Sequence, residues 1–403
     1  MRMTQTHWKK TLIFFSIVGV VLAGYVWADK TIGTVTYRKE NPSQTPALAS
    51  ATTSIESREA TAVAPTWPPP LDTAEYDRRM LDLVQYTPAG PTLVLSTTTD
   101  ASGVAVVTTA TTTPASPLQY SSDSNVTIAG KAWPPKRVYP NGGAVLPFQR
   151  ILAYYGNFYS RQMGILGEYE PAEVLRRLAE TQAKWEAADP DTPVLPAIEY
   201  IAMVAQADAG ADGMYRTMMP DAEIEKAYAL TQQIDGVMIL DIQTGLSPLQ
   251  AELPRFEKYL KRPDVFFALD PEFSMSNGAR PGTVIGSLSA QEINYAINYL
   301  SEIVKENQLP PKVLLVHRFT QNMVTGATQI KPTPEVQVVM VMDGWGPRDL
   351  KRATYRHIIE PEPVQFTGLK VFYKNDLKPP STGLLSPAEI LQLYPSPIFI
   401  QYQ

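Results

Sequence analysis

The run of residues 265–272, Val-Phe-Phe-Ala-Leu-Asp-Pro-Glu, decides the fold of this chain. Five apolar residues followed at once by a carboxylate are typical of a buried strand that ends where a loop begins. Asp270 and Glu272 are two residues apart, so an unbroken strand would turn both to the side of Ala268. Pro271 donates no backbone hydrogen bond, which favours a strand end over a mid-sheet position. The opposite side carries Val265, Phe267 and Leu269, which suits a layer between a sheet and its helices.

Seven more short apolar runs share the last part of the chain with this one, and amphipathic segments separate them. The eight predicted strands are Ile151–Gly156, Val194–Ile201, Val237–Asp241, Val265–Asp270, Val313–His317, Val336–Met342, Leu369–Tyr373 and Ile398–Tyr402. The predicted helices start at Pro171 and continue with Asp221–Gln233, Pro248–Leu260, Ser289–Asn307, Asp349–Ile358 and Pro387–Leu393. Ser289 and Glu292 form a capping-box pattern.

This alternation of strands and helices indicates parallel βαβ units. Eight such units predict a (β/α)8 TIM barrel over residues 147–403, a length typical of that fold. The main alternative is a doubly wound open sheet. That fold normally has a glycine-rich phosphate loop after an early strand, and this sequence has none.

The N-terminus has the pattern of a targeting segment. Arg2, Lys9 and Lys10 precede an apolar run from Leu12 to Ala28. The length of the run predicts a transmembrane signal anchor within residues 1–30, and the positive flank predicts that the rest of the chain is extracytoplasmic. We therefore expect a single-pass protein of the cell membrane. The alternative is a signal peptide cleaved near Ala28, which would give a secreted protein.

Residues 31–146 are dominated by Thr, Ser, Ala and Pro. A segment of this composition buries too little apolar surface to offset the entropy of ordering, so we predict a disordered extracytoplasmic linker. Two pieces within it, Thr92–Ser96 and Gly103–Thr108, have strand propensity and could pair locally.

The 403 residues carry a net charge of −5 and include no cysteine. The lack of cysteine excludes disulfides, thiolate catalysis and zinc–thiolate sites. No large block of one charge is present, and nucleic-acid-binding proteins usually have a basic patch. The sequence therefore argues against nucleic acid as a partner, and no pattern in it calls for a cofactor.

Polar residues collect where the predicted strands end, which is where active sites form in this fold. The candidate catalytic residues are the carboxylates Glu199, Asp241, Asp270 and Glu272. The candidate substrate-binding residues are Tyr155, Asn157, Gln243, His317, Asp343, Trp345, Lys374 and Gln401. Paired carboxylates can divide acid and base work, because one held neutral donates a proton while one kept ionised stabilises positive charge, attacks carbon or activates water.

The tripeptide Asp270-Pro271-Glu272 resembles the Asp-x-Glu at the end of the fourth strand in barrel-fold glycoside hydrolases, such as family 25 lysozymes and family 18 chitinases. The longer chitinase signature is absent, because Ala268 stands where it requires an aspartate. The resemblance implies a proton donor at Glu272 and a supporting carboxylate at Asp270.

The barrel also resembles a group of uncharacterised exported bacterial TIM-barrel proteins. The segments that carry this resemblance are residues 154–157, 163–169, 269–273, 316–319, 342–345 and 372–374. This resemblance implies a barrel fold and an exported location, and it implies no particular reaction.

Three functions follow from these observations. The leading one is a cell-surface glycoside hydrolase that acts on a carbohydrate or cell-envelope polymer. The second is a metal-dependent hydrolase, such as a phosphodiesterase, with oxygen and nitrogen ligands from Glu199, Asp241, Asp270, Glu272 and His317. The sequence has only three histidines and no His-x-His spacing, so we assign no metal ligand under the leading interpretation. The third is a non-catalytic glycan-binding surface protein.

Overall fold

The computed structural model of the protein describes residues 68–85, 92–99, 105–112, 127–128, 131–132 and 138–403. Eight parallel strands in its C-terminal part form a closed ring. They are β5 (Arg150–Gly156), β6 (Val194–Ala205), β8 (Val237–Ile242), β9 (Val265–Leu269), β11 (Lys312–Arg318), β13 (Val336–Met342), β14 (Phe366–Val371) and β15 (Phe399–Tyr402). The ring closes because β5 pairs with both β6 and β15. The predicted (β/α)8 barrel is therefore confirmed.

All eight predicted strands are present. The largest difference is at β14, which runs over Phe366–Val371 where we predicted Leu369–Tyr373. A short strand, β7 (Arg216–Met218), turns back antiparallel to the end of β6, and another short pair, β10 (Leu288–Ser289) and β12 (Val324–Thr325), is parallel.

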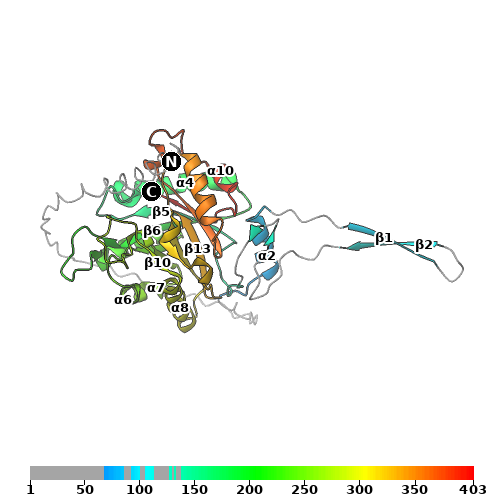
Figure 1. Ribbon diagram of the computed structural model, residues 1–403, viewed down its shortest axis with the longest axis horizontal. Coiled ribbons are helices and arrows are strands. Elements are labelled where there is room, and N and C mark those ends of the chain that lie inside the picture. Colours follow the sequence, from blue (N-terminus) through cyan, green and yellow to red (C-terminus); the bar gives the residue numbers. More distant parts are fainter. Residues whose placement is uncertain (1–67, 86–91, 100–104, 113–126, 129–130, 133–137) are drawn as a thin grey trace, which may run out of the picture. The chain divides into compact units, whose positions relative to one another are not determined.

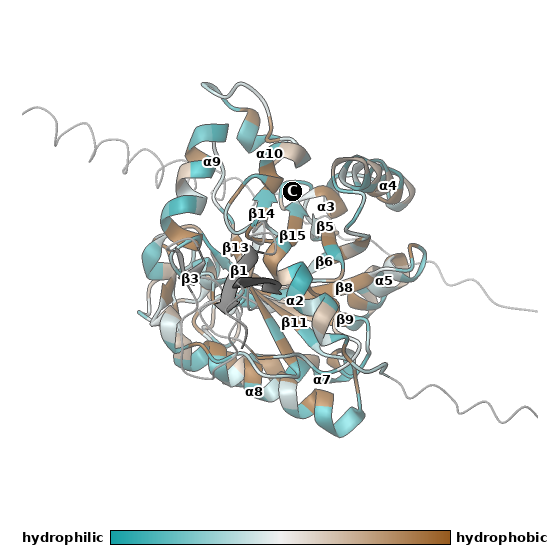
Figure 2. Cartoon of the chain, turned by 90° about the vertical axis from the view of Figure 1, so that its right-hand side faces the viewer, coloured by the Kyte–Doolittle hydropathy of each residue, from teal (hydrophilic) through white to brown (hydrophobic). Residues whose placement is uncertain are grey.

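Helices surround the ring, as Figure 2 shows. They are α3 (Ile165–Glu168), α4 (Pro171–Ala188), α5 (Asp221–Gln232), α6 (Leu249–Glu252), α7 (Glu257–Leu260), α8 (Ala290–Asn307), α9 (Arg348–Thr354) and α10 (Pro387–Leu391). Local signals set several of their ends. Pro171 occupies the first turn of α4, where its missing N–H has no helical partner to lose. The predicted capping box at the start of α8 is confirmed, since Ser289 and Glu292 each bond to the other's backbone N–H.

The strands have two apolar faces that belong to two separate cores. Phe267 and Leu269 lie in the core between the ring and the helices, whereas Ala268 lies in a second core inside the ring. The same alternation puts Ile239 and Val341 inside the ring. The side-chain parity predicted from the sequence is confirmed, and it determines which polar residues face the barrel interior.

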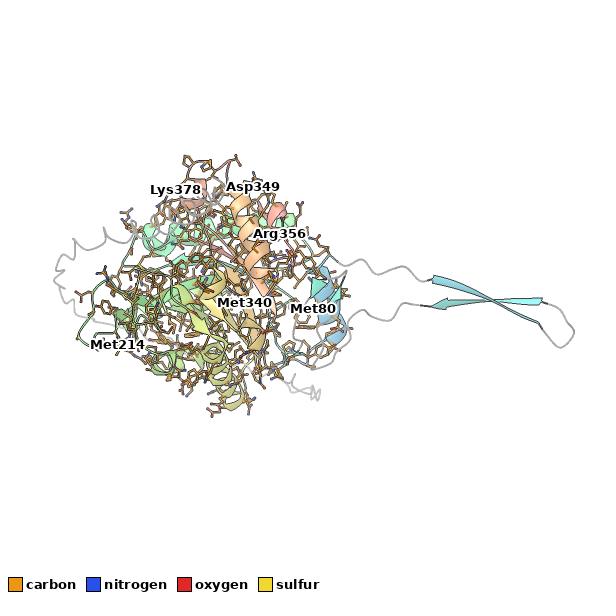
Figure 3. The ribbon with its side chains drawn as sticks, in the orientation of Figure 1. Met80, Met214, Met340, Asp349, Arg356 and Lys378 are labelled. Atoms are coloured by element: carbon orange, nitrogen blue, oxygen red, sulfur yellow. The ribbon has the colours of Figure 1, made fainter. Side chains whose placement is uncertain are left out.

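The inner core is covered by a helix that the sequence analysis did not predict. Within the segment assigned to a disordered linker, Thr73–Asp82 forms α2, and Asp72 caps its first turn. Tyr76, Met80, Leu83 and Val84 are buried in the same core as Ala268, and Figure 3 labels Met80 on this helix. The backbone also joins the two parts, because the N–H of Ser396 donates to the carbonyl of Leu83 at 2.7 Å. The prediction of a disordered linker is therefore wrong for these residues. They are ordered because four apolar side chains pack against the barrel.

The two strand-prone pieces of the same segment pair with each other. β1 (Thr92–Thr99) and β2 (Ala105–Thr112) form an antiparallel hairpin (Figure 1), and two short strands, β3 (Thr127–Ile128) and β4 (Lys131–Ala132), form another pair. The predicted membrane segment Leu12–Ala28 lies outside the described residues. Among the residues that are described, no helix has the length and apolarity to cross a bilayer.

Lys312, at the start of β11, makes the stability of the barrel depend on pH. Its ammonium group is fully buried and donates to the carbonyl of Val265 at 2.9 Å and to that of Arg262. Burial lowers the pKa of Lys312 to about 7. Between this pH and the ordinary lysine value the unfolded chain binds more protons than the folded chain, so this residue adds stability as the pH rises. Between pH 7.5 and 9.5 we expect the unfolding free energy of the wild type to rise by roughly 2 kcal/mol relative to that of Lys312→Met. Urea unfolding at both pH values measures this change.

Candidate active site

Each strand of the ring, or the residue that follows it, contributes one polar or aromatic side chain to a layer at the carboxyl ends of the strands. In chain order these residues are Tyr155, Glu199, Asp241, Asp270, His317, Asp343, Lys370 and Gln401. None of them is more than 8% exposed. They lie one step further along the strands than the apolar residues of the inner core, so the barrel is apolar below this layer and highly charged within it.

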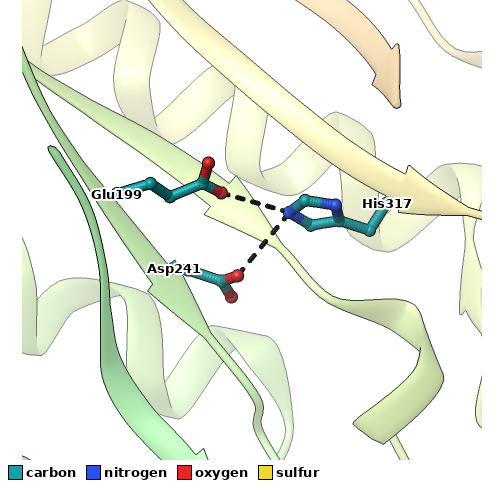
Figure 4. Close-up of side chains that lie close together, drawn as sticks. All are labelled: Glu199, Asp241 and His317. Carbon is teal, nitrogen blue, oxygen red and sulfur yellow. Dashed lines mark hydrogen bonds and ion pairs between the residues drawn. The ribbon is translucent and has the colours of Figure 1, made fainter. Parts of the chain in front are cut away.

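His317 lies at the centre of the layer. Its Nε2 is 3.2 Å from Oε1 of Glu199 and 3.6 Å from Oδ2 of Asp241, as Figure 4 shows. On its other side, Nδ1 is 3.4 Å from Oδ2 of Asp343. Three carboxylates from three different strands therefore surround one imidazole ring.

Asp343 links this group to the opposite wall of the barrel. Its Oδ1 is 3.1 Å from Nζ of Lys370 on β14. The same ammonium group lies 3.9 Å from the centre of the Tyr155 ring, a distance typical of a cation–π contact. Lys370, Asp343, His317 and Glu199 thus form a row of alternating basic and acidic groups across the barrel, which we call the charge row. Asp343 therefore lies between two basic groups, one on each side.

Asp270 and Glu272 occupy a tight turn rather than a continued strand. β9 ends at Leu269, and Asp270 caps the short 3-10 helix η2 (Pro271–Phe273) by accepting the backbone N–H of Glu272 at 3.1 Å. The other oxygen of Asp270 accepts a hydrogen bond from Nε2 of Gln243 at 3.0 Å. Both oxygens of Asp270 are therefore engaged. The carboxyl group of Glu272 is half-buried and forms no hydrogen bond or ion pair with any residue in the described part of the chain.

The turn is held in place by the loop that follows it. The N–H of Gly286 donates to the carbonyl of Glu272 at 2.7 Å. A Cβ at residue 286 would lie 2.6 Å from the carbonyl oxygens of Pro271 and Ser274, so only glycine permits this approach. The loop therefore fixes the backbone of Glu272 from one side while Asp270 fixes it from the other.

The crowding of carboxylates changes how they ionise. Burial raises the pKa of Glu272 well above its usual range, and the charges of Asp270 and Asp343 raise it further. Burial also raises the pKa of Asp241 well above its usual range and that of Asp270 to about 6, although His317 opposes both shifts. Burial alone would lower the pKa of His317, but its hydrogen bond to Glu199 and the charges of Asp343, Glu199 and Asp241 raise it to about 9. An imidazolium among carboxylates, some of them protonated, is the result.

Several buried polar atoms in the layer have no hydrogen-bond partner among the described residues. They are Oε2 of Glu199, both carboxylate oxygens of Asp241, Nδ1 of His317, Oδ1 of Asp343 and both amide atoms of Gln401. Buried polar groups in native proteins are almost always satisfied, so such a concentration of open donors and acceptors is typical of a functional site.

The remaining predicted site residues lie outside this layer. Asn157 is buried in the loop after β5, where its side chain donates to the carbonyl of Ile201 and accepts the N–H of Tyr159. Trp345 is half-buried in the loop after β13, with Lys378 over its ring. The side chain of Lys374 is 68% exposed and pairs with Glu168. The basic residue of β14 that faces the site is Lys370, which the sequence analysis left out of the site. Its even spacing from Phe366, a residue of the inner core, is the signal that could have identified it.

No protein-family model matches the chain, and no curated protein matches it. The solved structures similar to it include a cellulase, a mannanase and an endoglucanase. A cellulase, Cel5C_n, is 11% identical with a TM-score of 0.32, over 55% of this chain and 65% of that chain. A mannanase of Bacillus subtilis is 11% identical with a TM-score of 0.33, over 64% of this chain and 81% of that one. A GH5-4 endoglucanase of Clostridium longisporum is 10% identical with a TM-score of 0.34, over 64% of this chain and 86% of that one. The chain thus spans just under two thirds of the length of the cellulase. The pairing of the eight strands into a closed ring identifies the fold as a barrel.

Proposed function

We propose that the protein is a glycoside hydrolase in which Glu272 donates the proton to the leaving group. The observation that carries this proposal is the state of Glu272, a half-buried carboxyl group without a protein partner whose pKa is raised well above the usual range. A carboxylic acid that stays protonated near neutral pH is what the protonation of a glycosidic oxygen requires. Asp270 positions this residue, since its own carboxylate oxygens are occupied by the backbone of Glu272 and by Gln243.

The second carboxylate of the mechanism is Asp343. It is 8% exposed, whereas Glu199 and Asp241 in the same layer are fully buried. Its contacts with Lys370 and His317 hold it in place for a role in stabilising positive charge on a sugar ring or in activating water. Two aromatic residues are candidates for contact with a sugar face, Tyr155 against Lys370 and Trp345 in the loop after β13.

The proposal is tested by the release of reducing ends from peptidoglycan, chitin, and plant and bacterial glycans. The chain from Pro68 onward is suitable, since it keeps α2 on the barrel. We expect release from at least one of these polymers, with an activity that declines as the pH rises through the pKa of Glu272. Saturable binding without any release would favour the non-catalytic glycan-binding function instead.

We further propose that the barrel acts outside the cytoplasm and that residues 1–30 tether it to the membrane. The support for this is the basic flank before the apolar run Leu12–Ala28. Protease treatment of intact cells should remove the barrel while the N-terminal segment stays with the membrane fraction. A barrel that resists protease until the cells are broken would contradict this location.

A further inference from the structure

We infer that Glu199, Asp241 and His317 form a binding site for a divalent transition-metal ion. One ligand atom from each of the three lies within 4.8 Å of the others, and all three side chains are buried. The inference goes beyond the proposed hydrolysis, because it concerns three residues that the proposed proton transfer does not use and is tested without any glycan.

The two distances from His317 to the carboxylates are close to those between neighbouring ligands of one ion. Zinc–nitrogen and zinc–oxygen bonds are about 2.0–2.2 Å long, so two ligands lie about 3.0 Å apart at a right angle and about 3.4 Å apart at a tetrahedral angle. Nε2 of His317 is 3.2 Å from Oε1 of Glu199 and 3.6 Å from Oδ2 of Asp241. In Figure 4 both carboxylates point toward this one nitrogen.

The other nitrogen of His317 provides a second observation. A histidine that binds a metal through one nitrogen usually donates the N–H of the other nitrogen to a carboxylate, which fixes the tautomer and the ring orientation. Nδ1 of His317 is 3.4 Å from Oδ2 of Asp343, and Asp343 is itself held by Lys370 at 3.1 Å. The charge row therefore places a carboxylate beside the nitrogen of His317 that would face away from the ion.

Unsatisfied oxygens and an excess of carboxyl groups also support an ion at this place. Oε2 of Glu199 and both oxygens of Asp241 are buried and accept no hydrogen bond from the described residues. The layer and the adjoining turn hold five carboxyl groups, those of Glu199, Asp241, Asp270, Glu272 and Asp343, against the two basic groups of His317 and Lys370. An ion at this place is bound by the ionised carboxylates and the neutral imidazole, so its binding releases the protons that these groups hold.

The ligand set selects the class of ion. One imidazole nitrogen and two carboxylates suit Zn²⁺, Mn²⁺, Fe²⁺ or Co²⁺, whereas Mg²⁺ and Ca²⁺ prefer oxygen ligands alone. Three protein ligands leave at least one position for water or a ligand from the barrel mouth, as in open metal sites.

The test uses the full chain, stripped with a chelator and then titrated with Zn²⁺ and, separately, with Mn²⁺. We expect about one Zn²⁺ per chain to remain after dialysis and the melting temperature to rise with the ion concentration. Glu199→Gln and Asp241→Asn keep the side-chain shape and should each weaken binding by more than about 100-fold, while Asp343→Asn should weaken it by about 10- to 100-fold. Circular dichroism of each stripped variant checks that it is folded, and either ligand variant suffices for the test.

Two matched controls should bind like the wild type. His357→Gln removes an exposed histidine in the helical turn η5 (Tyr355–Ile359) that follows α9, and Glu335→Gln alters a buried glutamate at the opposite end of the barrel. The inference is overturned if neither ion changes the melting temperature and none remains after dialysis, or if Glu199→Gln and Asp241→Asn both retain wild-type affinity. Because the readout is ion binding, a protein that binds the ion and hydrolyses no glycan would contradict only the proposed function.

Discussion

Replacing Glu272 with glutamine is expected to lower the rate of glycan hydrolysis by about 10²- to 10⁴-fold, the usual contribution of a general acid. Glutamine has nearly the same shape, and the backbone bonds that hold this residue, to Asp270 and Gly286, are kept. Only the transferable proton is lost. The measurement is the initial rate of reducing-end release at several pH values, where the variant should also lose the decline at high pH that ionisation of Glu272 causes in the wild type.

The matched control is Glu186→Gln on α4, an exposed glutamate on the outer side of a barrel helix. It should hydrolyse the same polymer at the wild-type rate. If Glu272→Gln keeps the full rate and the same pH profile as this control, then Glu272 is not the acid.

Truncating Met80 to alanine should lower the free energy of unfolding by about 2–5 kcal/mol, the range for a fully buried methionine. Met80 is 3% exposed and lies in the inner core with Tyr76 and residues of the barrel strands. Its loss leaves a cavity between α2 and the ring that neither element can fill alone. Urea unfolding followed by circular dichroism measures the change.

Arg78→Ala on the same helix is the control. The Arg78 side chain is 54% exposed and pairs only with Glu75 and Asp82 of its own helix, so its removal should change stability by less than about 1 kcal/mol. Equal effects of the two substitutions would mean that α2 contributes nothing to the barrel. A large difference would mean that a chain starting at residue 147 lacks part of its core.

Much of the barrel could be predicted from the sequence because its signals are local. Alternation along five residues such as 265–269 is enough to assign an inner and an outer face, and the two cores follow those assignments. Asp241, Asp270, His317 and Gln401 were likewise identified from their places at strand ends, and the structure brings them into one layer.

What could not be predicted depends on contacts between distant parts of the chain. The strand β14 was placed too late, so Lys374 was chosen over Lys370 although the chain has already left the strand at Phe372. Helix α2 was missed because its apolar residues stand alone in a Thr- and Pro-rich segment, and their partners are barrel residues more than a hundred positions away in many cases. The contact between His317 and Glu199 could not be predicted either, because the residues around each of them in the sequence give no sign of the other.

The charge row also limits how deep any ligand can penetrate. Since its members are buried and the inner core fills the barrel beneath them, a bound molecule can touch the row only from the side of Glu272 and must find its other contacts higher up. Those contacts belong to the loops that follow the strands, such as the loop of Trp345 and the segment from Ser274 to Ser287. Selectivity between one ligand and another is then a property of exchangeable surface segments, and these segments can diverge or be transplanted between barrels while the reactive groups stay unchanged.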